Sequence, residues 1–131
     1  MAHSYGTLIS AWALRRYNLE KLANIDNLIL AGSPGVGVGT RLIGAPSPPA
    51  LPIATSLHHW LHFRGGLFAL EAPGDPIVSS HFYGARVSDF YDVCKLPVGT
   101  VTGHGNYFDP STTSLQAVVA AIQGRYGIQC R

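Results

Sequence analysis

The first residues of the chain carry the feature that most constrains its fold, the pentapeptide Ala2-His3-Ser4-Tyr5-Gly6. Small residues two positions before and after a serine are typical of the strained turn that presents a reactive serine between a strand and a helix. Ala2 stands where glycine is usual but keeps the small size. The pattern predicts a helix from about Tyr5, whose N–H is the first donor to an oxyanion on a substrate. Because Ser-x-Gly also arises by chance, the interpretation depends on the other residues of the chain.

The composition narrows the class of protein. The 131 residues are enough for one domain, and 47% are hydrophobic against 12% charged, so a buried core is expected rather than disorder. The net charge is +2 and the basic residues are scattered apart from Arg15-Arg16, so nothing indicates nucleic-acid binding. The sequence shows no membrane-spanning run and no leader, and its two cysteines do not make a disulfide framework. Cytoplasm is the default location.

Strand-like and helix-like segments alternate along the chain. Apolar runs without alternation at 28–31 and 67–70 are typical of strands buried on both faces of a parallel sheet. A third short strand is expected at 100–102, with helices over 5–17 and 110–123. This order predicts an α/β fold with a short parallel sheet of about three strands flanked by helices.

The apolar positions of the two helices predict how each is buried. The first helix is expected to be buried on most sides, through Leu8, Ile9, Ala11, Trp12 and Ala13. The last helix is expected to have Asp109 as N-cap, Pro110 as its first residue and Gly124 as its C-cap glycine. Its apolar face is predicted to comprise Leu115, Val118, Val119 and Ile122.

One segment has no strand of its own. Residues 41–66 begin with a proline-rich stretch and are interpreted as a lid-like insert over a site, with a helical patch at 56–63. A short helical piece is also expected at 19–23. We assign the whole chain, residues 1–131, to a single domain.

Three residues are candidates for catalysis. A serine hydroxyl needs a base to take its proton, and the base needs a carboxylate to orient it. Ser4, Asp75 and His104 occur in the chain order serine, acid, histidine, and each stands where a strand ends or should end. Ligands bind at that edge of an open parallel sheet. The simpler alternative for Asp75 and His104 is that each is an ordinary loop residue.

Five motifs along the chain resemble a known family. They are His3-Ser4-Tyr5-Gly6, Gly32-Ser33-Pro34-Gly35-Val36-Gly37, Ala72-Pro73-Gly74-Asp75-Pro76-Ile77, Tyr83-Gly84-Ala85-Arg86 and Gly103-His104-Gly105-Asn106-Tyr107-Phe108. Together they resemble the C-terminal half of a poorly characterised α/β-hydrolase domain family of bacteria, from Ala2 to Gly124.

The resemblance implies a serine hydrolase with Ser4 as nucleophile, Asp75 as acid and His104 as base. Tyr5, His3 and Ser33 are assigned to oxyanion or substrate binding. The expected activity is esterase-like, on an ester or related acyl bond of a small molecule, without a cofactor or metal.

Only three residues precede Ser4, and the strands that precede this turn in such a fold are absent from the sequence. The loop that gives the second oxyanion donor is absent with them. The fold is therefore expected to be partial. The alternative function is a truncated or split hydrolase half, inactive alone, that self-associates or binds a chain supplying an N-terminal half. A small binding module is a third class.

Two other motifs are weighed as binding sites. The glycine-rich stretch 32–40 lacks the Lys-Ser/Thr of a phosphate loop and the third glycine of a dinucleotide fingerprint, so a flexible loop is favoured. His58 and His62 have the spacing of a zinc-binding helix, but His59 stands where a metalloprotease has glutamate. These histidines are expected to line a lid helix, and their role is left open.

Overall fold

The computed structural model describes residues 1–17, 21, 24–38 and 56–126. A parallel sheet with strand order β1-β2-β3-β4 lies at its centre. Its strands are β1 (Ala2–His3), β2 (Asn27–Ala31), β3 (Gly66–Leu70) and β4 (Cys94–Lys95). The helices are α1 (Tyr5–Tyr17), α3 (Leu57–Leu61), α4 (Pro76–Ser80), the 3-10 turn η1 (Val87–Asp89) and α5 (Thr113–Ile122).

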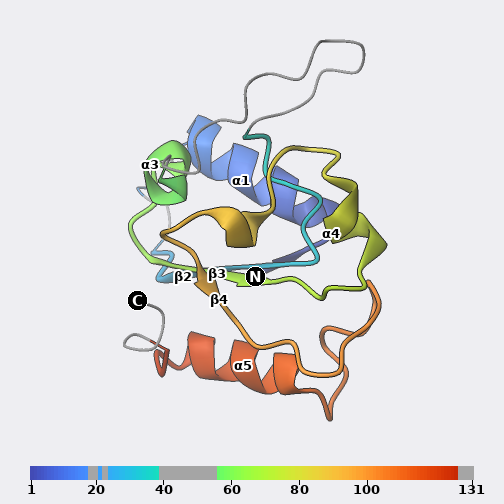
Figure 1. Cartoon of the computed structure of the whole chain (residues 1–131). Helices are drawn as coiled ribbons and strands as arrows, with labels where there is room; N and C mark the ends of the chain where they lie inside the picture. The colour runs from blue at the N-terminus through green and yellow to red at the C-terminus, as the bar shows by residue number, and fades with distance from the viewer. Residues whose placement is uncertain (18–20, 22–23, 39–55, 127–131) are drawn as a thin grey trace.

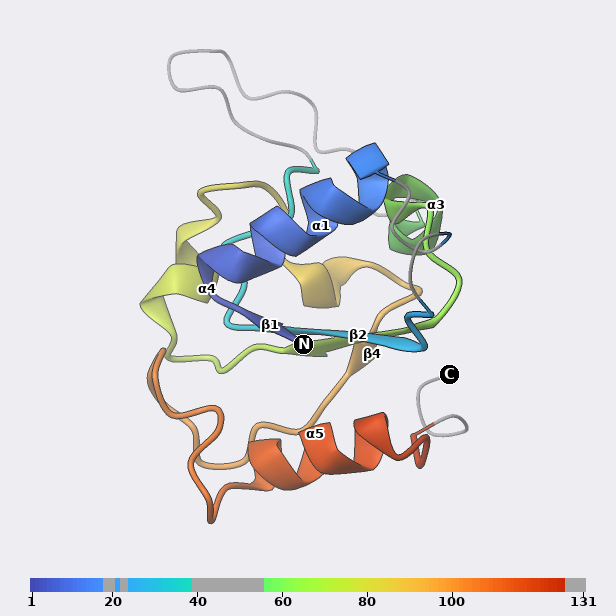
Figure 2. The same cartoon turned by 180° about the vertical axis from the view of Figure 1, so that it is seen from behind.

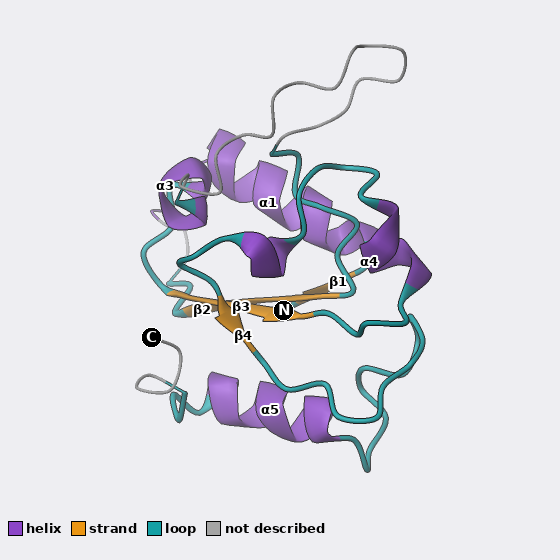
Figure 3. Ribbon diagram, in the orientation of Figure 1, coloured by secondary structure: helices purple, strands orange, loops and turns teal. Residues whose placement is uncertain are grey.

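Helices cover both faces of the sheet. Figures 1 and 2 show α1 and α3 on one face and α5 on the opposite face. Figure 3 shows the same layers coloured by secondary structure, with the strands stacked between the helices. The expected α/β class, a short parallel sheet flanked by helices, is confirmed.

Successive side chains of β2 and β3 enter two hydrophobic cores, one on each face of the sheet. Leu28 and Leu30 pack in the cluster that contains Ala11 and Leu14 of α1, whereas Ile29 and Ala31 pack in the cluster of α5. Successive side chains of a strand point to opposite faces, so both faces of these runs are apolar.

The prediction of a strand at 100–102 is wrong. Those residues form a turn and loop, although Val101 is buried. The sheet instead has β4, whose Cys94 and Lys95 pair with Phe68 and Ala69 of β3. It also has β1, which pairs with β2. Each of these strands is two residues long and therefore too short to produce a periodic pattern.

The helix predicted over 5–17 is confirmed, and its predicted burial is right for Leu8 and Ala11 but wrong for Ile9 and Trp12. Its buried residues are Thr7, Leu8, Ala11 and Leu14, while Ile9 and Trp12 are 57% and 53% exposed. Ala11 is wholly buried and belongs to the same core cluster as Leu28 and Leu30 of β2.

The predicted apolar face of α5 is right for Val118, which is buried, and for the half-buried Leu115, but wrong for Val119 and Ile122. Its buried residues are Ser114, Ala117, Val118 and Ala121, whereas Val119 and Ile122 are exposed. Its N-cap is Thr112, whose Oγ1 accepts the N–H of Leu115, rather than Asp109. Gly124 follows the helix with a φ of 72°, as expected of a C-cap glycine.

Several expectations fall wholly or partly outside the described residues. These are the piece at 19–23, apart from Lys21, and residues 41–55 of the lid-like insert. Within that insert, α3 forms in the predicted patch, with Ser56 as its N-cap. The single-domain assignment and the cytoplasmic location stay predictions. No helix among the described residues is long and apolar enough to cross a membrane.

Candidate active site

Ser4 lies in a strained turn between β1 and α1. Its φ is 56°, a left-handed conformation that costs a residue other than glycine about 1–3 kcal/mol. The turn is held by the Ser4 N–H, which donates to the Ala31 carbonyl at 2.9 Å, and by the Thr7 hydroxyl, which donates to the Ser4 carbonyl at 2.7 Å. Because β1 pairs with the end of β2, these bonds fix Ser4 at the carboxyl edge of the sheet.

Ser4, His104 and Asp75 form one hydrogen-bonded chain. The Nε2 of His104 lies 2.7 Å from the Ser4 Oγ, and its Nδ1 lies 2.9 Å from the Asp75 Oδ2. A carboxylate can only accept, so His104 donates its Nδ1–H to Asp75 and its Nε2 accepts the Ser4 hydroxyl. Three loops far apart in the sequence therefore meet at one point.

Asp75 is wholly buried and receives several donors. Burial by itself raises the pKa of this carboxyl, but hydrogen bonds from the Tyr107 hydroxyl, His104 and the Ile77 N–H outweigh burial and lower its pKa. Asp75 is also the N-cap of α4, where it accepts the N–H of Ile77 at 2.8 Å. The carboxyl is thus held ionised beside His104.

Tyr107 is a site residue that the sequence analysis missed. Its buried hydroxyl donates to the Asp75 Oδ2 at 2.7 Å and accepts the Ala72 N–H at 2.9 Å. Burial raises the pKa of Tyr107, so its proton stays available as a donor. The nearby Gly103-His104-Gly105 motif is the sequence signal for this region. A tyrosine three residues after His104 forms no recognisable pattern of its own, so the motif did not identify Tyr107.

Gly32 is a second residue that the sequence analysis did not assign to the site. It follows β2 with a φ of 56°, and a Cβ there would lie 3.0 Å from both His104 and Tyr107 and 3.1 Å from the Asp75 Oδ2. A side chain at this position would therefore press on the hydrogen-bonded chain. A glycine directly after a buried strand is the sequence signal for such a close approach.

His3 contacts the site through His104. The two rings stack with centroids 4.7 Å apart, and the His3 Nε2 lies 2.9 Å from the His104 carbonyl oxygen. The rings of Tyr107 and Phe108 pack edge-on against His3. His3 therefore holds the loop that carries His104.

Tyr5 and Ser33 differ in their access to a substrate. Tyr5 is half-exposed beside Ser4, and as the first residue of α1 its N–H has no acceptor within the helix. Ser33 is wholly buried, and its hydroxyl bonds with the Thr7 hydroxyl and the Gly35 N–H. A substrate contact does not fit this burial, so Ser33 joins the glycine-rich loop to α1 instead.

The histidines of the 56–63 patch do not assemble a metal site. His58 binds Asp92 through its Nδ1 at 2.9 Å and the Gly65 carbonyl through its Nε2 at 2.9 Å. The described residues contain no group of three or more His, Cys, Asp or Glu side chains placed to hold a metal ion.

A groove of about 520 Å³ lies along α1, and its lining includes Tyr5, the residue that follows Ser4. It is lined mainly by Tyr5, Leu8, Ile9, Trp12 and Tyr83. The rings of Tyr5 and Tyr83 meet edge-on at 5.6 Å at the serine end. Its volume and largely apolar lining suit an apolar chain or ring.

Comparison with known proteins gives one match. Residues 1–42, which contain the turn at Ser4, match the family model described as alpha/beta hydrolase. Searches of curated proteins and of solved structures found no match. Over these residues the match is consistent with the resemblance to α/β-hydrolases noted in the sequence, and it supports a hydrolase-like function.

Proposed function

We propose, from the α/β-hydrolase match, that this chain is an esterase-like serine hydrolase that acts on an ester or related acyl bond. The observation that carries the proposal is the Ser4-His104-Asp75 chain, with 2.7 Å and 2.9 Å between its members. Ser4 attacks the acyl carbon while His104 takes its proton and passes it to the leaving group. Water then releases the acyl group, with His104 again as the base.

Two features support the roles that we propose for Tyr5 and Asp75. The Tyr5 N–H at the start of α1 donates to the oxyanion, because helix N-terminal N–H groups favour negative charge. Asp75 orients His104 and stabilises its charged form, and a buried carboxylate with a lowered pKa suits that role.

The groove along α1 indicates the kind of acyl or alcohol group. Its largely apolar lining includes Tyr5, which follows Ser4 in the chain, so we propose that it holds a medium-length alkyl or aromatic group of the substrate. Longer p-nitrophenyl esters are then expected to have a lower KM than the acetate ester, and Trp12→Ala is expected to reduce this difference.

Labelling with a fluorophosphonate probe tests the nucleophile. Wild-type protein and the matched control Ser111→Ala, which alters an exposed loop serine, are expected to label equally. Ser4→Ala is expected to lose the label entirely. Labelling that persists in Ser4→Ala, in a sample whose circular dichroism matches wild type, contradicts the proposal.

A split or self-associating hydrolase is the second proposal. It is supported by the exposed Ile9 and Trp12 on α1 and by β1, whose outer edge has no partner strand among the described residues. An uncovered strand edge favours pairing with another chain. Sedimentation of wild type and Trp12→Ala, with an ester assay on the same samples, distinguishes the proposals. A fully active monomer contradicts association, whereas a shift in mass in Trp12→Ala supports it.

A further inference from the structure

A second hollow, of about 830 Å³, lies at the C-terminal end of α1. Its rim is unusually basic, because the four Lys and Arg side chains that line it come from three segments: Arg15, Arg16, Lys21 and Arg64. His59 and His62 of the α3 region line it as well. Four of the nine Lys and Arg residues of the chain therefore surround one hollow.

These cations are not neutralised within the described part of the molecule. The ion pairs found there join His58 to Asp92, Arg86 to Asp89 and His104 to Asp75. No Asp or Glu lines the hollow among the described residues. Asp92, the carboxylate bound to α3, already accepts the Ser56 hydroxyl and two backbone N–H groups besides His58.

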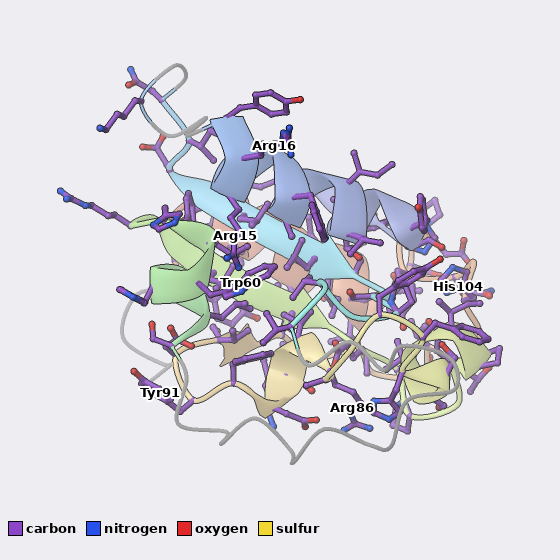
Figure 4. All side chains as sticks on the ribbon, turned by 90° about the horizontal axis from the view of Figure 1, so that it is seen from above. Arg15, Arg16, Trp60, Arg86, Tyr91 and His104 are labelled. Atoms are coloured by element: carbon purple, nitrogen blue, oxygen red, sulfur yellow. The ribbon has the colours of Figure 1, made fainter. Side chains whose placement is uncertain are left out.

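Packing holds one of the cations in position. The Arg15 guanidinium lies 4.5 Å from the centre of the Trp60 ring, and Trp60 itself packs against the core. Figure 4 shows Arg15 beside Trp60 and well apart from His104, which lies at the right of the view. At about 1.5 Å rise per residue, Arg15 lies roughly 16 Å along α1 from Ser4.

We propose that this hollow binds a small molecule bearing two or more phosphate groups, at a site separate from Ser4. Like charges gathered with no acidic partner among the described residues repel one another, and a polyanion relieves that repulsion. Guanidinium groups bind phosphate oxygens bidentately, and here Arg15 is oriented before the ligand arrives. The low net charge of the chain and the small extent of the cluster, four of the nine Lys and Arg residues around one hollow, favour a small ligand over a nucleic acid.

Isothermal titration calorimetry at low ionic strength tests the proposal without any assay of hydrolysis. The probes are inorganic pyrophosphate and adenosine diphosphate, which distinguish a free phosphate ligand from a nucleotide. Wild type is expected to bind at least one of them saturably. The double variant Arg15→Gln, Arg64→Gln is expected to bind about tenfold or more weakly, because two charge-assisted contacts are lost.

A matched control removes the same charge elsewhere. Arg86→Gln, Arg125→Gln alters two arginines that do not line the hollow, and its affinity is expected to stay within about twofold of wild type. Saturable binding lost only in the first double variant supports the proposal. Absence of saturation in wild type with both probes, or equal weakening in both double variants, overturns it. Arg64→Gln alone, on an exposed loop, gives the same test if Arg15→Gln disturbs the packing on Trp60.

Discussion

The molecule contains two aspartate–histidine pairs with the same spacing but different surroundings. In each pair a histidine Nδ1 lies 2.9 Å from a carboxylate oxygen, in Asp75–His104 and in Asp92–His58. The other nitrogen of His104 faces the Ser4 hydroxyl, whereas that of His58 faces the Gly65 carbonyl. A carbonyl oxygen has no proton to give up. The group that faces the second ring nitrogen therefore distinguishes the proposed catalytic pair, Asp75–His104, from the structural pair, Asp92–His58.

The carboxylates also differ in what they hold. Asp75 is wholly buried and is fixed by the Tyr107 hydroxyl, which lies behind the site. Asp92 instead caps the first turn of α3, where it accepts the N–H groups of Leu57 and His58. Loss of Asp75 is thus expected to affect turnover, and loss of Asp92 to affect stability.

Replacement of each histidine gives the largest expected contrast. His104→Ala removes the proposed base, so kcat/KM for an ester substrate is expected to fall by about 1,000-fold or more. His58→Ala is expected to leave kcat/KM within about threefold of wild type. Steady-state assays on variants with wild-type circular dichroism measure both. Comparable losses of kcat/KM in the two variants would show that the Asp75–His104 and Asp92–His58 pairs do not differ in role.

Asp92→Asn is expected to reduce stability without reducing turnover. It weakens the bonds that hold Ser56 and the first turn of α3, so the free energy of unfolding should fall by about 2 kcal/mol at pH 7. Burial raises the pKa of Asp92, but the Ser56 hydroxyl and the α3 N–H groups lower it to about 2 from an ordinary value of 3.8.

That lowered pKa sets the sign of the pH dependence. The folded state binds the proton more weakly than the unfolded state, so the stabilisation is complete above about pH 4 and is lost as the pH falls towards 2. Urea unfolding of wild type and Asp92→Asn at pH 7 and at about pH 3 measures the change. A difference that stays constant over this range would show that Asp92 does not titrate as described.

Tyr107→Phe tests how the surroundings of Asp75 differ from those of Asp92. It removes the hydroxyl that lowers the pKa of Asp75, so that pKa should rise, and the loss of kcat/KM caused by protonation of Asp75 should begin at a higher pH than in wild type. At neutral pH we expect a loss of about tenfold. Tyr91→Phe, at an exposed tyrosine, is the control and should not shift the profile. An unshifted profile in Tyr107→Phe would assign Tyr107 to packing alone.

His3→Phe is expected to have the smallest effect. The variant keeps a ring to stack on His104 but loses the bond to the His104 carbonyl. We expect kcat to fall about threefold with KM unchanged, because His3 positions the base and does not contact the substrate. A change confined to KM would instead place His3 in substrate binding, as assigned from the sequence.

The sequence by itself determined the local features. The pentapeptide at Ser4 predicted the strained turn and the start of α1, and the apolar runs predicted β2 and β3, because these depend on the size and polarity of neighbouring residues. The order of Ser4, Asp75 and His104 identified the residues that meet.

Only the tertiary structure decided which faces and partners these elements use. It left Ile9 and Trp12 exposed although their spacing resembles that of a buried helix face, because burial depends on which side of α1 meets the sheet. It placed Tyr107 behind Asp75 and gathered scattered cations such as Arg15 and Arg64 around one hollow. These contacts join residues far apart in the chain, and a one-dimensional pattern records spacing along the chain rather than distance across it.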